Sequence, residues 1–260
     1  MNPGALADTY LALGAMLTKI GRFDEGLAYL ERVVAIRKSM LDANPTDRGN
    51  RGSWIDAQLV MARGWLAAGK APQALQCADT RLEAAGAMVA GDPSNSVYRR
   101  DQWVARMVRA NALGVAGNHA GAAAEYRQVL DLIAALADAD PGDRGHRRGV
   151  AVNWLGLADS LVALKQPLEA ERAYSRAVAE SEALWRQDPK KIETTIDLGR
   201  MYTHLGRLYG TIGNLSQAQT FLEKGRRLID EASAKDPQDA ALQKSKAEAG
   251  PDLLSVNKNN

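Results

Sequence analysis

Hydrophobic residues recur along this chain at steps of three and four, the spacing that predicts amphipathic helices. In one such stretch, residues 170–185, the apolar positions share one face: Ala170, Ala173, Tyr174, Ala177, Val178, Leu184 and Trp185. Charged residues such as Glu169, Arg172 and Arg176 fall off that face. Stretches of this kind, each about 20 residues long, alternate along the chain between turn residues.

The turn residues repeat at a constant step of 48. One series consists of prolines that each follow an Asn or Asp: Pro45, Pro93, Pro141, Pro189 and Pro237. Such a pair stops a helix, because proline disfavours helical geometry in the residue before it and cannot continue the hydrogen-bond ladder. A second series marks the other turn, through a left-handed residue: Gly21, Gly69, Gly117, Lys165 and Gly213. At this position in repeat 4, Lys165 should lower the stability of the fold by about 1 kcal/mol, because a left-handed conformation disfavours a side chain.

Two more series with the same step contain only small residues. They are Gly14, Ala62, Ala110, Ala158 and Gly206, and Gly26, Ala74, Ala122, Ala170 and Ala218. They predict the points where the two helices of a hairpin approach closely. Helix A, a short turn, helix B and an Asn/Asp-Pro turn, repeated five times, predict an all-α solenoid of five antiparallel hairpins.

The repeats are expected to form one solenoid domain with boundaries at 3–47, 48–95, 96–143, 144–191 and 192–237. Residues 238–249 are expected to form a short polar capping helix. Residues 250–260 are expected to be disordered.

The pattern resembles the tetratricopeptide repeat. Repeat 4 carries the family's succession of bulky and small residues at Trp154, Leu157, Ala158, Leu161, Ala170, Tyr174 and Ala177. Repeats 1 and 5 carry it too, whereas repeats 2 and 3 place Gln58 and Arg106 at the opening position. The resemblance implies a right-handed superhelix and a binding role. The step of 48 exceeds the family's usual period of about 34 and predicts longer helices of about 30 Å.

Composition excludes several classes of protein. Lys and Arg number 33 against 31 Asp and Glu, a net charge of +2, which argues against a dedicated nucleic-acid binder. The single cysteine, Cys77, excludes an internal disulfide and a cysteine-clustered zinc site. The sequence shows neither a signal-peptide pattern nor a run of about 18 apolar residues, so we expect a cytoplasmic protein with no membrane span.

No constellation for catalysis is visible. His119, His146 and His204 fall in three different repeats, none at metal-ligand spacing from another His or from Cys77, and are expected to be isolated. No nucleophile can be paired with a base, and no phosphate loop is present. We therefore expect no catalytic site, no metal and no cofactor.

The resemblance implies a concave groove lined by the A helices, which would bind a peptide or protein segment. The residues expected to bind it are Arg63, Met107, Asn111, Asp159, Arg200 and Arg207. This groove would run from acidic at Asp8 and Asp56 to basic at the fifth repeat. The central Leu59, Met107 and Leu155 would either receive an apolar side chain or pack between A helices, and both readings stay open.

Two other functions stay open. Arrays of this kind are similar to regions that follow bacterial serine/threonine kinase domains, so the chain could be the sensor or regulatory part of a signalling protein. Alternatively, an arginine stripe could bind an acidic partner or nucleic acid: Arg51, Arg99, Arg100, Arg147 and Arg148. The competing interpretation is that these arginines are solvated or neutralise turn residues such as Asp47 and Asp143. A homo-oligomer through a terminal repeat is also open.

Overall fold

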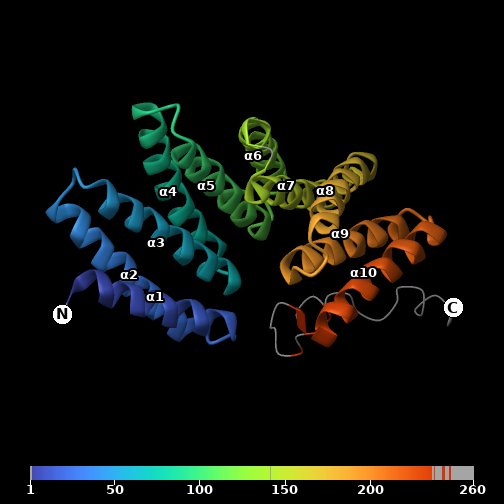
Figure 1. Cartoon of the computed structure of the whole chain (residues 1–260), viewed down its shortest axis with the longest axis horizontal. Helices are drawn as coiled ribbons and strands as arrows, with labels where there is room; N and C mark the ends of the chain where they lie inside the picture. Colours follow the sequence, from blue (N-terminus) through green and yellow to red (C-terminus); the bar gives the residue numbers. More distant parts are fainter. Residues whose placement is uncertain (1, 141, 236, 238–241, 244–245, 247–260) are drawn as a thin grey trace. The chain divides into compact units, whose positions relative to one another are not determined.

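The computed structural model describes residues 2–140, 142–235, 237, 242–243 and 246. Over these residues the chain forms ten helices and no strand (Figure 1). The A helices are α1 (Pro3–Lys19), α3 (Arg48–Ala67), α5 (Ser96–Val115), α7 (Arg144–Ala163) and α9 (Ile192–Thr211). The B helices are α2 (Phe23–Ala43), α4 (Ala71–Gly91), α6 (His119–Ala139), α8 (Pro167–Gln187) and α10 (Leu215–Lys235). The prediction of an all-α helix-hairpin repeat is confirmed.

The chain divides into two compact units, Met1–Leu132 and Ile133–Asn260, and the division falls within α6. In the first unit α1 to α5 each pack on the next helix, and α3 also touches the A helices α1 and α5. In the second unit α7 to α10 pack in the same succession, and α7 also touches α9. Each unit therefore has its own core between antiparallel helices.

The turn from an A helix to its B helix passes through a left-handed residue in all five hairpins. Gly21, Gly69, Gly117 and Gly213 have φ between 71° and 84°, and Lys165 has φ 59°. At the first turn the amide of Arg22 donates to the Leu17 carbonyl and that of Gly21 to the Thr18 carbonyl. These two bonds form a Schellman motif, which satisfies carbonyls left unpaired at the end of α1.

The turn from a B helix to the next A helix ends in a side-chain cap. Asp47 accepts the amide of Asn50, Asn95 accepts those of Val97 and Tyr98, and Asp143 accepts those of Gly145 and His146. Asn2 caps α1 in the same way. At the equivalent position before α9, Lys191 makes no side-chain cap. Four of the five A helices thus begin at an Asn or Asp that supplies the missing acceptor.

The small residues lie where the helices of a hairpin touch. A Cβ added to Gly14 would lie 2.8 Å from the Leu30 side chain and 3.0 Å from the Gly26 carbonyl oxygen. A Cβ added to Gly206 would lie 3.1 Å from the Ala218 carbonyl oxygen. The alanines at the equivalent positions of repeats 2, 3 and 4 are at most 1% exposed. The predicted close approach is therefore present.

The predicted capping helix at 238–249 and the tail at 250–260 lie outside the described residues, except for residues 242, 243 and 246, which are helical. Of these, Leu242 is fully buried and clusters with Ile196 and Ala232. None of the described helices is long and apolar enough to cross a membrane.

Replacing Lys165 by Gly should raise the free energy of unfolding by up to about 1 kcal/mol, because Lys165 holds a left-handed conformation that a Cβ disfavours. The reciprocal change, Gly213→Lys, should lower it by a similar amount. Urea unfolding followed by circular dichroism measures both. A loss of stability in Lys165→Gly would mean that the lysine side chain makes a stabilising contact larger than the backbone strain.

Candidate protein-binding surface

In the first unit, the row of apolar residues on the A helices is part of the core. Leu59 and Met107 pack against the buried cluster of Ala62, Ala78 and Val108. In the second unit the equivalent Leu155 and Thr203 are 6% and 4% exposed. The geometry supports the reading in which this row packs between helices, with Met107 half-buried. Arg63 and Asn111, one turn further along their helices, are exposed.

The acidic residues predicted at the start of the groove are paired within their own hairpins. Asp8 on α1 forms an ion pair with Arg37 on α2. Asp56 on α3 lies with its Oδ1 3.5 Å from Nη1 of Arg81 on α4. Although both carboxylates are largely exposed, their charge is offset from within the chain. The start of the predicted groove, at the first two repeats, therefore carries much less net negative charge than the sequence suggests.

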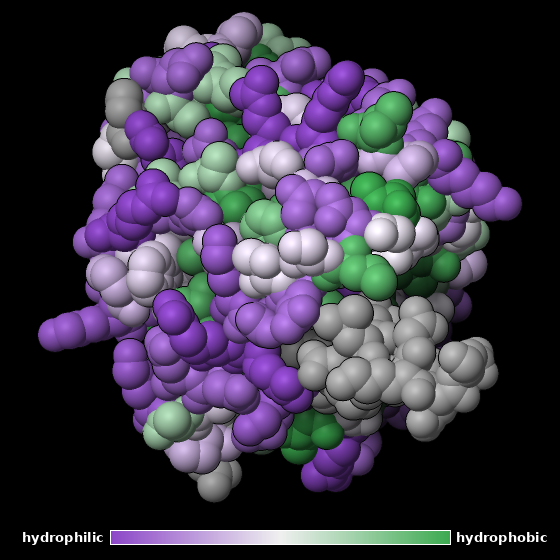
Figure 2. Space-filling model, turned by 90° about the vertical axis from the view of Figure 1, so that its right-hand side faces the viewer, coloured by the Kyte–Doolittle hydropathy of each residue, from purple (hydrophilic) through white to green (hydrophobic). Residues whose placement is uncertain are grey.

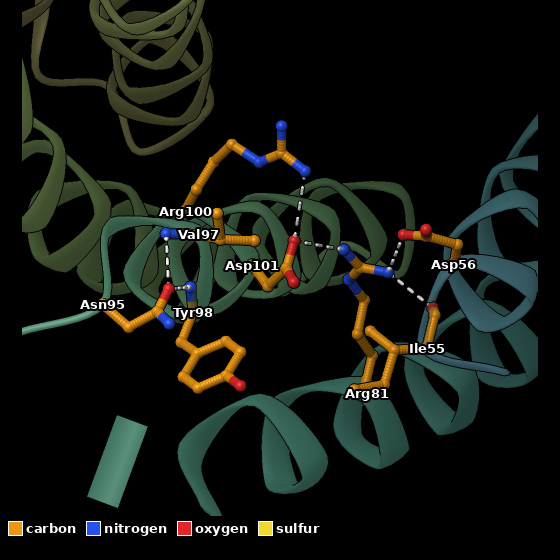
Figure 3. A network of polar contacts seen from close by, with 8 residues as sticks. All are labelled: Ile55, Asp56, Arg81, Asn95, Val97, Tyr98, Arg100 and Asp101. Atoms are coloured by element: carbon orange, nitrogen blue, oxygen red, sulfur yellow. Dashed lines mark hydrogen bonds and ion pairs between the residues drawn. The ribbon is translucent and has the colours of Figure 1, made fainter. Parts of the chain in front are cut away.

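Arg81 is the centre of a buried polar network (Figure 3). Its side chain is 2% exposed, donates to the carbonyl oxygen of Ile55, and lies 3.4 Å from Oδ1 of Asp101 on α5. Arg100 approaches the same oxygen at 3.6 Å, as Figure 3 shows. Burial lowers the pKa of Arg81 and raises that of Asp101, so desolvation outweighs the attraction between them. The network ties α3, α4 and α5 together.

A second ionic cluster joins α4, α5 and α6 within the first unit. Arg106 Nη1 lies 2.9 Å and Arg109 Nη1 2.7 Å from the two carboxylate oxygens of Glu125. Arg109 Nε also lies 2.6 Å from Asp79 Oδ1. Glu125 is 8% exposed, so this carboxylate is held by two arginines in a largely desolvated site.

Sequence reasoning missed both clusters, although the repeat itself carries the signal. At the step of 48, the residues equivalent to Arg81 are Val33, Val129, Ala177 and Gly225. Those equivalent to Arg109 are Leu13, Met61, Leu157 and Leu205, and those equivalent to Glu125 are Tyr29, Cys77, Ala173 and Phe221. Burying a charged side chain without a partner is unfavourable. A charged residue at a repeat position that is uncharged in the other copies therefore predicts an internal ion pair.

Two of the predicted binding residues are oriented by tyrosines of their own hairpin. The Tyr126 hydroxyl donates to Asn111 Oδ1 and the Tyr174 hydroxyl donates to Asp159 Oδ1, each at 2.5 Å. The pairs occupy equivalent positions in repeats 3 and 4. Burial and the nearby Asp159 raise the pKa of Tyr174, which keeps its hydroxyl protonated as a donor. Asn111 and Asp159 are therefore exposed side chains with fixed orientation.

The expectation that His204 is isolated is wrong. Its Nδ1 lies 2.7 Å from Asp159 Oδ1, which connects α9 to α7 within the second unit. His204 also stands one turn after Arg200 and one turn before Arg207, so the three share a face of α9. All three side chains are partly exposed. The structure thus brings together Asp159, Arg200 and Arg207 from the predicted set and adds His204 to them.

Three of the five arginines of the stripe contact groups of the chain itself, and these contacts are not with Asp47 or Asp143. Arg148 binds Asp197 on α9 through Nε at 2.5 Å and Nη2 at 3.3 Å. Arg100 pairs with Asp101, and Arg51 donates to the Pro45 carbonyl at 2.8 Å. The turn residues Asp47 and Asp143 instead cap α3 and α7. These three arginines therefore stabilise helix starts and helix contacts.

Among the described residues, no three His, Cys, Asp or Glu side chains gather as a metal site would require. Two histidines do pair with a single carboxylate: His204 with Asp159 at 2.7 Å, on the A-helix face described above, and His146 with Asp143 at 3.1 Å, so His146 is not isolated either.

Comparison with known proteins identifies the repeat. Family models described as tetratricopeptide repeat match residues 6–47 and residues 199–225, which include most of hairpin 1 and much of hairpin 5. Hairpins 1 and 5 therefore match the tetratricopeptide repeat. No curated protein matches the sequence.

Solved structures with similar helical repeats support the same fold over most of the chain. A putative kinesin light chain from Podosopora anserina with nearly identical TPR-like repeats is similar at 20% identity and a TM-score of 0.61, over 92% of this chain and 100% of that one. The apo form of RapI is similar at 12% identity and a TM-score of 0.63, over 97% and 81%. A STAND signal-transduction ATPase with a tetratricopeptide repeat sensor from Pyrococcus horikoshii is similar at 12% identity and a TM-score of 0.56, over 100% and 38%. At these identities the likeness shows the fold and not the ligand.

Replacing Arg81 by Met should lower the free energy of unfolding by about 3–5 kcal/mol, because Asp101 then stays buried without its main partner. Arg100→Met is the matched control, since Arg100 contacts the same carboxylate from an exposed position and should cost less than about 1 kcal/mol. The double variant Arg81→Met/Asp101→Leu should recover most of the loss. Chemical denaturation tests the series, and equal losses in the two single variants would contradict it.

Cys77 should react slowly with thiol reagents in the folded chain. It is half-buried among Leu27, Leu30 and Met61, and burial raises the pKa of its thiol to about 11. At pH 8 the thiolate fraction, and hence the rate of alkylation, should be about 100-fold below that of a free cysteine. Because Cys77 is the single cysteine, mass spectrometry of the intact chain follows the reaction directly. The urea-unfolded chain is the control, and a folded-state rate that stops rising near pH 9 would contradict the prediction.

Proposed function

We propose that this tetratricopeptide-repeat scaffold binds a segment of a partner protein along the exposed faces of its A helices. In the first unit this face includes Arg63, Met107 and Asn111, and in the second unit Asp159, Arg200 and Arg207. The fold and the repeats support a role in protein interaction. We assign the binding to the A-helix face because polar side chains project from it.

The observation that carries the proposal is the row on α9. Arg200, His204 and Arg207 follow one another at steps of four and three, so three polar side chains that can donate hydrogen bonds project from one face. Asp159 joins this row from α7 through its contact with His204 and supplies an acceptor beside it. An extended segment or a helix running across α7 and α9 would meet donors and an acceptor in sequence.

The orientation of these groups explains why the surface suits binding. Tyr174 and His204 both hold Asp159, and Tyr126 holds Asn111, so their rotamers are set before a ligand arrives. Ordering a flexible side chain at an interface costs about 0.5–1.5 kcal/mol, a cost that a preformed surface largely avoids. The mechanism is equilibrium recognition, with no chemical step.

The arginine stripe does not favour the nucleic-acid alternative, because Arg51, Arg100 and Arg148 contact groups of the chain itself. The signalling alternative keeps one supporting observation: the similar STAND ATPase carries its tetratricopeptide repeats as a sensor, and this chain covers 38% of that protein. In such a role the partner segment would belong to the same signalling protein, and the A-helix face would still be the surface that binds it.

The double variant Arg200→Glu/Arg207→Glu should weaken binding of a selected peptide at least 10-fold, because it reverses two charges on the proposed surface. The peptide would be selected from a random library on the intact chain, and its affinity measured by fluorescence polarisation. The matched control is Arg226→Glu/Arg227→Glu, two exposed arginines of the B helix α10, which should change the affinity less than about twofold. A single Arg63→Glu variant tests the face of the first unit.

If the selected peptide binds the α9 variant as tightly as the unchanged chain, the binding site lies elsewhere. Loss of binding in the α10 variant alone would move it to the B helices.

A further inference from the structure

The accessible surface of α9 consists mainly of basic side chains. From residue 194 to residue 210, every residue of this helix is buried except four: Arg200, His204, Arg207 and Gly210. The acidic residue of this stretch, Asp197, is 8% exposed and is held by Arg148 of α7. The side chains that α9 offers to a ligand are therefore two arginines with a histidine between them, about one turn apart.

One acidic side chain lies between the two arginines. Asp159 of α7 reaches His204, the middle residue of the row, with Oδ1 2.7 Å from Nδ1. The Tyr174 hydroxyl donates to the same oxygen at 2.5 Å, so α8 and α9 both hold the carboxylate in place. The row thus runs from positive through negative to positive. Its two arginines outweigh the single carboxylate, so its net charge is positive even when His204 is neutral.

The spacing of the arginines sets the spacing of the charges that they can bind. Arg200 and Arg207 are seven residues apart, which is two turns and about 10 Å along the helix axis. In an extended segment, residues i and i+3 are also about 10 Å apart. A guanidinium pairs with a carboxylate or a phosphate through two parallel hydrogen bonds. An extended segment along the row can therefore place one acidic side chain on each arginine.

Contacts within the chain are compatible with this role. Arg200 and Arg207 both interact with other groups of the chain. A guanidinium has five N–H donors, so a contact with a neighbour uses only part of its capacity. Burial and Asp159 raise the pKa of Tyr174, and the positive charge of Arg207 partly opposes them. Arg207 therefore belongs to the same polar cluster as Asp159 and Tyr174.

Charge, and not apolar area, distinguishes this surface. In the row of larger A-helix residues beside it, Leu155 and Thr203 are only 6% and 4% exposed. The side of the molecule drawn in Figure 2 is mostly hydrophilic, with hydrophobic groups dispersed among polar ones. Exposed apolar groups dispersed in this way are ordinary and mark no binding site. Recognition on the A-helix face of the second unit must therefore depend on its charged side chains.

We propose that this face recognises a protein segment with two acidic side chains three positions apart and no acidic side chain between them. Arg200 and Arg207 each bind one acid, and Asp159 repels a third acid placed between the two. The inference rests on the proposed function, because it names the partner chemistry of the same surface. Asp and Glu carboxylates and phosphorylated serine share the chemistry that the arginines bind.

Selection of a random peptide library on the full chain tests the spacing. Selected peptides should be enriched at least threefold in acid pairs at i and i+3, compared with the unselected library, and depleted of acids between them. Replacing either acid of a selected peptide by Gln should weaken binding at least 10-fold in fluorescence polarisation. A synthetic peptide with phosphoserine at both acid positions should also bind, and the tighter of the two forms identifies the natural source of the charge.

A charge exchange tests the two arginines. Changing one acid of the peptide to Lys should abolish binding to the unchanged chain, and either Arg200→Glu or Arg207→Glu should restore it at least fivefold. The variant that restores binding should differ for the two acids, which gives the direction of the segment. Arg226→Glu/Arg227→Glu on α10 is the matched control and should restore neither peptide. Circular dichroism checks the fold of each variant.

Asp159→Asn tests the exclusion of a central acid. This variant keeps a side-chain oxygen that can accept from Tyr174, but it removes the negative charge. A peptide with Glu placed between its two acids should bind the unchanged chain at least fivefold more weakly than its parent. On Asp159→Asn the difference should fall below about twofold.

Two results separate this inference from the proposed function. If selected peptides lose binding in Arg200→Glu/Arg207→Glu but carry no acid pair, the surface binds by other chemistry and only the inference is overturned. If the same peptides bind that variant unchanged, the proposed function is overturned and the inference with it. Failure of both arginine variants to restore either Lys peptide also overturns the inference, as does equal exclusion of the central acid by Asp159→Asn.

Discussion

In every hairpin the two helices approach each other where glycine or alanine stands on both, and the remaining structure depends on that approach. At Gly14 and Gly26 a single Cβ would meet the opposite helix at 3.0 Å or less. This distance lets the larger residues on either side interlock, so Leu30 and Val33 become fully buried although each hairpin is only two layers thick. Because the approach recurs with the repeat, the small buried positions of the hairpins recur as well.

A strict repeat makes its exceptions informative. Arg81, Arg109 and Glu125 replace uncharged residues at repeat positions close to the core, and each is compensated by a partner on a neighbouring helix. The first unit contains the internal ion pairs around Arg81 and Glu125, and the second contains tyrosine hydrogen bonds at Tyr202–Glu182 and Tyr209–Glu171 beside the Arg148–Asp197 ion pair. Such groups add less stability than apolar packing does, but each fixes which helices must be neighbours.

The same regularity separates the surfaces of the molecule. The A-helix face carries oriented polar side chains, the Asn/Asp-Pro turns carry capping groups, and the turns from A to B helices carry the exposed apolar residues. These surfaces differ in chemistry because each position of the repeat meets a different structural requirement.

The sequence by itself determined the helices, their turns and the close contacts, because each depends on local geometry or on a residue that recurs in every copy. Lys165 shows this well: its left-handed conformation followed from the glycines at the equivalent positions. Only the tertiary structure decided which partners the polar side chains of the candidate site have. The partners of Asp56, Asp159, Arg148 and His204 lie 15 to 49 residues away on other helices, at distances set by how the helices pack. The periodicity of one chain says which face a side chain occupies, but not which charge will stand opposite it.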